Sequence, residues 1–217
     1  MTHRRNFIAQ LGALASVLAV DPDELRAATV SSVSPWDTSW IDRLNSARFK
    51  AVFNASDIGD GAAMNYASTF LDHFHEVHAT ADQQTRPVIV FRRLGTQMAF
   101  NDLLWDRYAI GESLKINDPA TNAPAKRNVF WKKGDGASPQ ESSSTIRTLI
   151  RRGLISLVCN FSVTNWSRRT AEALNRSGDD VAAEVRANLV PDAILVPSGI
   201  YALIRAQNAG CAYMPGT

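Results

Sequence analysis

The chain has 217 residues, of which 45% are hydrophobic and 20% are charged, and its formal net charge at neutral pH is +2. This length is enough to bury a substantial core in one domain without stabilising crosslinks. The charge does not point to a nucleic-acid partner, because the basic pairs are scattered and lack interleaved aromatic residues (Arg92-Arg93, Lys132-Lys133, Arg151-Arg152 and Arg168-Arg169).

The amino terminus has the pattern of a bacterial twin-arginine (Tat) export signal. Arg4 and Arg5 precede Phe7-Ile8 and a mildly apolar run over residues 9–20. A basic segment before a short apolar run is typical of a targeting segment, and this run is too short to span a bilayer. The alternative is an ordinary basic amino terminus. We expect residues 1–28 to be a Tat-type signal. The protein is then expected to be periplasmic or otherwise exported, without stable membrane insertion after export.

Residues 29–46 are predicted to form a linker and a short docking helix. A Ser/Val-rich segment comes first, and Trp36, Trp40, Ile41 and Leu44 then recur at helical spacing. Aromatic side chains at such positions are more often anchors than ligand-stacking groups.

Residues 47–217 carry the pattern of one α/β domain. Short apolar runs typical of buried strands occur at residues 49–53, 87–91, 154–159, 193–196 and 211–214. Helical segments separate them, and parallel neighbouring strands need such crossovers. The sequence predicts a single three-layer domain, with a mostly parallel sheet of about five strands and helices on both faces.

Periodicity also predicts the helices between these strands. The first has one apolar stripe, formed by Ala63, Ala67, Phe70, Phe74 and Val77. Two more helices are expected over residues 98–108 and 141–152. Between them, residues 110–138 turn polar and show no sustained period, which predicts a long excursion of the kind that is often functional or mobile.

Two helices are expected near the carboxyl terminus. Ser177-Gly178-Asp179-Asp180 resembles a capping box, and it precedes a helix whose apolar side carries Val181, Val185 and Leu189. The last helix stops at Gly210, and its predicted apolar side carries Ile200, Leu203 and Ile204.

Ligands of open parallel sheets bind outside the carboxyl ends of the strands. The residues that follow the predicted strands are therefore the candidate ligand-binding residues: Asp57, Arg92 and Arg93, Cys159 with Asn160, and Ser198. Together they predict a crevice for a small anion or metabolite.

Cys159 is the candidate nucleophile. A thiol between a strand end and a helix start can be stabilised as the thiolate by free backbone amides and the positive helix end, and a neighbouring Arg92 or Arg93 can lower its pKa further. The alternative is a buried cysteine that packs as a small hydrophobic residue.

The two cysteines are not expected to pair. Cys159 ends one predicted strand and Cys211 begins another. In parallel strands such positions lie about 15 Å apart, whereas a disulfide requires Cα atoms within about 7 Å. Both thiols are predicted to be reduced.

The sequence predicts no metal site and no cofactor. On a helix, only His75 and His78 of the triplet His73, His75 and His78 can share an ion, and nothing nearby completes a ligand set. Gly59-Asp60-Gly61 lacks the third glycine of a phosphate loop, which argues against a flavin or nucleotide. Asp57 and Asp60 can hold a hard cation or serve as turn and cap residues.

Four stretches in the carboxyl-terminal half resemble the DsrE-like family: Arg152-Gly153-Leu154-Ile155-Ser156-Leu157-Val158-Cys159-Asn160, Asn188-Leu189-Val190-Pro191, Val196-Pro197-Ser198-Gly199-Ile200 and Ala206-Gln207-Asn208-Ala209-Gly210-Cys211-Ala212-Tyr213. The signal, followed by Trp36-Asp37-Thr38-Ser39-Trp40 and Lys50-Ala51-Val52-Phe53, is similar to the Tat-exported branch of that family. The resemblance covers most of the mature chain.

The resemblance implies a compact α/β sheet assembled as a trimer or hexamer, with residues 47–217 as the DsrE-like domain. It also implies a cysteine that carries sulfur as a persulfide, and Cys159 stands at the matching position. A sulfur donor or acceptor protein would then be a partner.

Two hypotheses follow. In the first, Cys159 accepts a sulfane sulfur or thiol ligand, Arg92 or Arg93 stabilises the anion and Asn160 positions it. In the second, the protein is a non-catalytic oligomeric periplasmic module that binds a small anion or metabolite, and Cys159 is merely packed.

Overall fold

An all-parallel sheet lies at the centre of the domain. The computed structural model describes residues 34–132 and 143–216. The strands are β1 (Phe49–Ala55), β2 (Thr85–Phe91), β3 (Ile155–Cys159), β4 (Ala193–Val196) and β5 (Ala212–Pro215), arranged in the order β4-β3-β2-β1-β5. Every neighbouring pair is parallel. The predicted α/β fold is thereby confirmed, as are the positions of all five strands.

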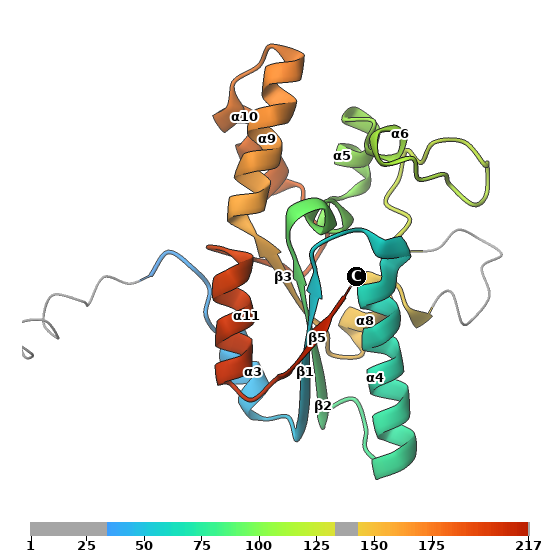
Figure 1. The fold of residues 1–217 in the computed structure, drawn as a ribbon, viewed down its shortest axis with the longest axis vertical. Helices are drawn as coiled ribbons and strands as arrows, with labels where there is room; N and C mark the ends of the chain where they lie inside the picture. The colour runs from blue at the N-terminus through green and yellow to red at the C-terminus, as the bar shows by residue number, and fades with distance from the viewer. Residues whose placement is uncertain (1–33, 133–142, 217) are drawn as a thin grey trace, which may run out of the picture. The chain divides into compact units, whose positions relative to one another are not determined.

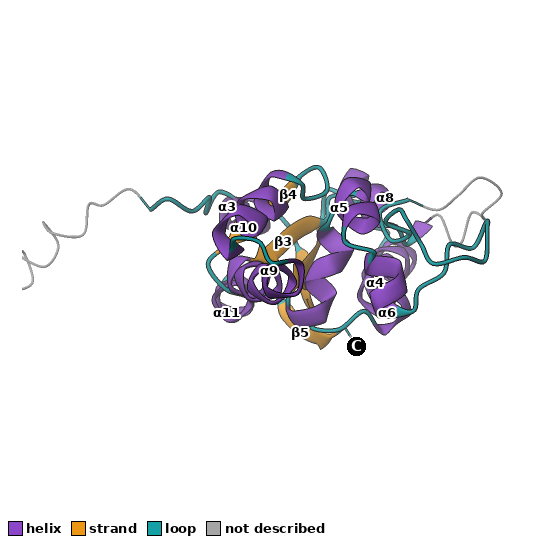
Figure 2. Cartoon of the chain, turned by 90° about the horizontal axis from the view of Figure 1, so that it is seen from above, coloured by secondary structure: helices purple, strands orange, loops and turns teal. Residues whose placement is uncertain are grey.

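Helices cover both faces of the sheet (Figure 1). On one face, α3 (Trp40–Asn45) and α11 (Gly199–Asn208) enclose a core that includes Trp40, Leu44, Val52 and Ala202. The larger core on the other face is built with α4 (Ala62–His78), α8 (Ile146–Arg151), α9 (Asn160–Leu174) and α10 (Gly178–Ala187). Seen from above, α4 and α11 lie on opposite sides of the sheet (Figure 2).

The predicted Tat signal at residues 1–28 lies outside the described residues, as do the start of the predicted linker and residues 133–138 of the excursion. Within the described part of the chain, no helix is both long and apolar enough to span a bilayer. The predicted docking helix corresponds to α3, whose Trp40 and Leu44 are fully buried.

The helix predicted over residues 98–108 is wrong, because the chain breaks in the middle. A 3-10 helix, η2, covers Arg93–Ala99, and an α-helix, α5, covers Asp102–Arg107. Between them, Phe100 is extended and pairs with Leu189 in an antiparallel bridge. The side chain of Asn101 then caps α5 by accepting a hydrogen bond from the Leu104 amide.

The described part of the excursion, residues 110–132, is more ordered than its composition predicts. It begins with a helix, α6 (Ile110–Leu114), and Ala125, Val129 and Phe130 are buried in the larger core. The fully buried Asn128 holds this segment in place, since its Nδ2 donates to the carbonyls of Met98 and Phe100.

Three predicted apolar faces are partly wrong. Val77 of α4 is 72% exposed. Leu189 lies beyond the end of α10, although Ser177 caps that helix as predicted. On α11, Ile200 and Ile204 are exposed, and Gly199, Ala202 and Ala206 face the core instead. Small residues at this spacing let α11 approach the sheet closely, which leaves its larger residues outside.

Candidate functional site

A crevice of about 650 Å³ opens at the carboxyl edge of the sheet. Its walls come from the segments that follow β2, β3 and β4. α9 continues from β3 into the core on one face, whereas α11 continues from β4 into the core on the other. The two helices diverge, and the space between their amino ends is the crevice, as expected where successive crossovers go to opposite faces.

Cys159 lines the crevice, although only 4% of the residue is exposed. It is the N-cap of α9, and its Sγ accepts a hydrogen bond of 3.3 Å from the Ser162 amide. The thiol therefore lies at the start of a helix of 15 residues, where the helix dipole favours negative charge.

Ser162 connects Cys159 to the segment after β2. Its hydroxyl accepts a hydrogen bond of 2.8 Å from the Arg93 backbone amide. Arg93 has a φ of 53°, an uncommon conformation for a residue other than glycine. The serine therefore holds a strained turn against the first turn of α9, with the Arg93 side chain exposed at the crevice.

Arg92 is positioned by a chain of hydrogen bonds through the sheet. Its Nε donates to Asn54 Oδ1 at 2.7 Å, and Asn54 Nδ2 donates to the hydroxyl of Tyr213 on β5 at 3.0 Å. A methyl group at Gly199 would lie 2.7 Å from Arg92 Cδ. The absence of a side chain at Gly199 is thus what lets Arg92 lie across the start of α11.

Two further arginines complete the basic lining. Arg168 and Arg169, on α9, are exposed and line the same crevice as Arg92 and Arg93. None of the described residues that line it is acidic. The amino end of α11, capped by Ser198 Oγ accepting from the Tyr201 amide, adds a second positive helix end. The crevice is electrostatically suited to an anion.

The crevice lining also includes exposed apolar side chains. Leu94, Phe161 and Ile200 line the crevice and are 45%, 65% and 64% exposed. Asn165 and Ser162 add neutral polar groups to the same lining. A ligand with an anionic group and an apolar portion would contact both kinds of surface.

The structure brings four of the six predicted site residues together and leaves two outside. Arg92, Arg93, Cys159 and Ser198 line one cavity. Asn160 instead accepts a hydrogen bond of 2.9 Å from Arg186 Nε of α10. Asp57 accepts from the Ile58 amide at 2.7 Å in the turn after β1.

Ser162, Asn165, Arg168 and Arg169 are lining residues that were not predicted. The only signal in the sequence is their recurrence at three- and four-residue steps after Cys159, which places them along one side of α9.

The second cysteine has a different environment. Cys211 immediately precedes β5, and both thiols are free. Burial raises the pKa of Cys211 to about 11, although nearby Lys50 acts in the opposite direction. Its thiol is therefore protonated at neutral pH and a poor nucleophile.

Two residues of the histidine triplet, His75 and His78, make structural contacts. His75 Nε2 is 3.2 Å from Thr85 Oγ1 and 3.3 Å from Asp82 Oδ1, and His78 stacks on Phe49. Among the described residues, no group of three or more His, Cys, Asp or Glu side chains is placed to hold a metal ion.

Comparison of the chain with protein-family models, with curated proteins and with solved structures gives no significant match. The resemblance to the DsrE-like family therefore remains a prediction from the sequence.

Proposed function

We propose that the protein binds a small anion, or a metabolite with an anionic group, in the crevice at the carboxyl ends of β2, β3 and β4. The observation that carries this proposal is the gathering of Arg92, Arg93, Arg168 and Arg169 on one cavity without an acidic lining residue. Guanidinium groups suit carboxylates, sulfate-like anions and phosphates because they donate paired hydrogen bonds in a fixed plane.

The four arginines have different parts in this binding. Arg92 is held by Asn54 and gives the site a fixed donor. Arg93, Arg168 and Arg169 are exposed and make no side-chain hydrogen bond or ion pair with the described residues, so their guanidinium groups are available to a ligand. We further propose that the protein binds this anion after export and as a trimer or hexamer, since the sequence predicts both export and assembly.

Replacing Arg168 and Arg169 with glutamine should weaken anion binding by about tenfold or more, because each charged hydrogen bond contributes about 1.5 to 3 kcal/mol. Titration calorimetry of the full chain with inorganic sulfate, phosphate and thiosulfate would measure this change. Arg168 and Arg169 are exposed, so the midpoint of thermal unfolding should stay nearly unchanged.

The double variant Arg147→Gln with Arg151→Gln is the matched control, because it also removes two positive charges. Both arginines are exposed on α8, which precedes β3 and so lies away from the carboxyl edge of the sheet. The control should bind anions like the unsubstituted protein. Equal weakening by both changes would indicate a general effect of charge and would contradict a site in the crevice.

A second candidate function is sulfur handling by Cys159. It is favoured by a specific observation: Cys159 is a lining residue of the basic crevice, and its sulfur accepts an amide hydrogen bond, which a thiolate or persulfide anion would strengthen. With a polysulfide donor, the thiolate attacks the terminal sulfur. An S–S bond to Cys159 forms, an S–S bond of the donor breaks, and the donor leaves shortened by one sulfur.

Incubation with polysulfide should add about 32 Da, the mass of one persulfide sulfur, at Cys159. Cys211 is the internal control, because its raised pKa keeps it protonated at neutral pH. Peptide mass spectrometry of the alkylated protein would locate the sulfur, and Cys159→Ala should abolish the modification. Sulfur on Cys211 alone, or on neither cysteine, would leave anion binding as the function and exclude the sulfur carrier.

A further inference from the structure

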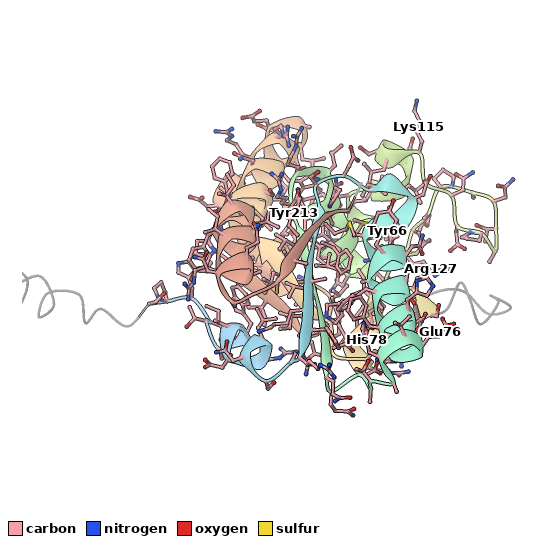
Figure 3. The ribbon with its side chains drawn as sticks, turned by 60° about the horizontal axis from the view of Figure 1, so that its bottom comes forward. Tyr66, Glu76, His78, Lys115, Arg127 and Tyr213 are labelled. Carbon is pink, nitrogen blue, oxygen red and sulfur yellow. The ribbon has the colours of Figure 1, made fainter. Side chains whose placement is uncertain are left out.

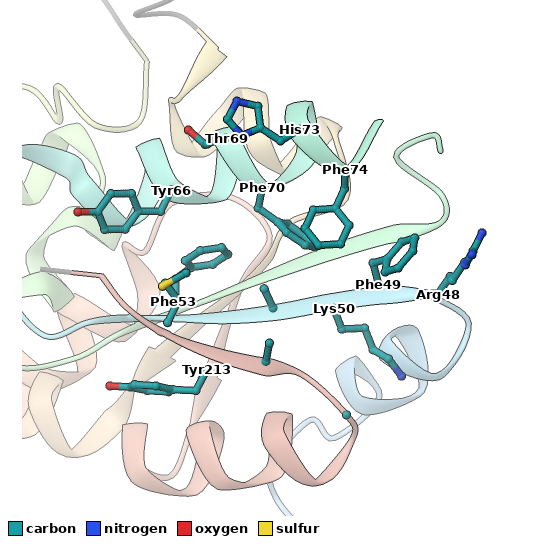
Figure 4. Close-up of a pocket in the computed structure, with 14 residues that line it drawn as sticks. Arg48, Phe49, Lys50, Phe53, Tyr66, Thr69, Phe70, His73, Phe74 and Tyr213 are labelled. Atoms are coloured by element: carbon teal, nitrogen blue, oxygen red, sulfur yellow. The ribbon is translucent and has the colours of Figure 1, made fainter. Parts of the chain in front are cut away.

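A second cavity, of about 590 Å³, lies on another part of the molecule, between α4 and the edge strand β5. It is bordered by β1, α4 and β5, and Figure 3 shows Tyr66 on α4 and Tyr213 on β5. The close-up in Figure 4 shows Phe49, Phe70 and Phe74 together between α4 and β1. We call this cavity the edge groove.

The floor of the edge groove exists because two small residues stand side by side. Ala51 of β1 pairs in register with Ala212 of β5, and the next pair on the same face is Phe53 with Met214. All four residues of β5 are exposed, so α4 covers β1 but leaves β5 open on this side. The pair of alanines therefore forms a depression between larger side chains.

Aromatic rings form a continuous wall above this floor. The ring centroids of Phe49 and Phe74 are 4.9 Å apart, those of Phe74 and Phe70 are 4.7 Å apart, and those of Phe70 and Phe53 are 6.2 Å apart. These rings are fixed by one another, so the wall is formed before any ligand arrives. A cavity of this size and lining is typical of sites for small organic molecules.

The basic side chains of the edge groove have no acidic counterpart among its described lining residues. Its described lining includes Arg48, Lys50 and His73 and no acidic residue. Lys50 Nζ donates to the Ala209 carbonyl, whereas the Arg48 guanidinium lies 4.8 Å from the centroid of the Phe49 ring and forms no ion pair with a described residue. Arg48 thus places a cation at the end of the aromatic wall, as Figure 4 shows.

We propose that the edge groove binds an amphipathic monoanion, such as a medium-chain or aromatic carboxylate. The apolar part lies along the phenylalanine rings over Ala51 and Ala212, and the carboxylate pairs with Arg48. This site is separate from the arginine-lined crevice and does not depend on the function proposed for it.

Titration calorimetry of the full chain with octanoate tests the proposal, with Ala212→Phe as the blocking variant. The new ring would fill the depression over the alanine pair, and octanoate should therefore bind about tenfold more weakly or not at all. Because Ala212 is on an exposed strand, the ring does not have to enter the core. Ala183→Phe is the matched control, since Ala183 is exposed on α10 and lies outside the edge groove. It should bind octanoate normally. Thermal unfolding would confirm that both variants fold.

The contribution of the charge is tested separately. Arg48→Gln should weaken octanoate binding by about fivefold while leaving binding of 1-octanol, which has no charge, unchanged. Equal octanoate binding by Ala212→Phe and the unsubstituted protein would overturn the proposal. So would an edge groove filled by a second copy, seen in sedimentation as a dimer that Ala212→Phe dissociates and that does not bind octanoate.

Discussion

Replacing Gly95 with alanine should destabilise the folded protein by about 3 kcal/mol, because the added methyl group has no room. A Cβ at Gly95 would lie 2.3 Å from the Ala55 carbonyl oxygen and 3.0 Å from that of Asp57. Both are backbone atoms, one at the end of β1 and one in the turn that follows it, so no side-chain rotation relieves the clash. The η2 segment would have to shift away from β1, and Arg93, in the same segment, would shift with it.

Urea denaturation followed by circular dichroism would measure this change, with Gly178→Ala as the control. A Cβ at Gly178 would lie 3.6 Å from Arg168 Cα, which is ordinary contact, and Gly178 is already helical. Alanine is the better helix former, so this variant should be neutral or slightly more stable. Gly95→Ala should also weaken anion binding. A Gly95→Ala variant as stable as the control would contradict the close approach of η2 to β1.

Replacing Asn128 with leucine should destabilise the protein by about 4 kcal/mol, since each buried polar group left unpaired costs about 1 to 3 kcal/mol. The Asn128 amide nitrogen donates to two carbonyls at 2.7 Å, those of Met98 and Phe100. Its Oδ1 accepts from the amides of Phe130 and Trp131. Leucine has the same branched arrangement of side-chain heavy atoms, although it is larger, and it can hydrogen-bond to none of these four backbone groups.

Asn117→Leu controls for the change of residue type. Asn117 is exposed in the same excursion and makes no side-chain hydrogen bond with the described residues, so its replacement should change stability by less than about 0.5 kcal/mol. Chemical denaturation of both variants gives the comparison. A small loss for Asn128→Leu would show that water replaces the side chain, and that this asparagine does not anchor the excursion.

The strands were predictable from the sequence because a parallel sheet covered on both faces needs short, continuous apolar runs. The helices were harder to predict where long-range contacts override the local hydrophobic pattern. The break at Phe100 depends on its bridge to Leu189, far away in the sequence. The exposure of Ile200 follows from the close packing of Ala202 and Ala206, which hydrophobicity alone does not indicate.

The candidate site, too, was predictable only in part. The rule that ligands bind at strand ends nominated Arg92, Arg93, Cys159 and Ser198, which line one crevice. It could not find Arg168 and Arg169, because they come from within α9 and reach the crevice only through the direction of that helix. It also could not foresee that Asn160, next to Cys159, would bond to Arg186 on α10.

The pairing of β5 with β1 has a consequence for the order in which the molecule forms. Asn54 and Tyr213 are hydrogen-bonded across 159 positions of sequence, and β5 ends at Pro215. Closing so long a loop adds little to the equilibrium cost, but such distant contacts slow folding. During synthesis, β1 stays an open edge until β5 has emerged. A nascent or prematurely terminated chain therefore presents that edge to neighbouring chains, and binding by a chaperone at this stage would protect it from misassembly.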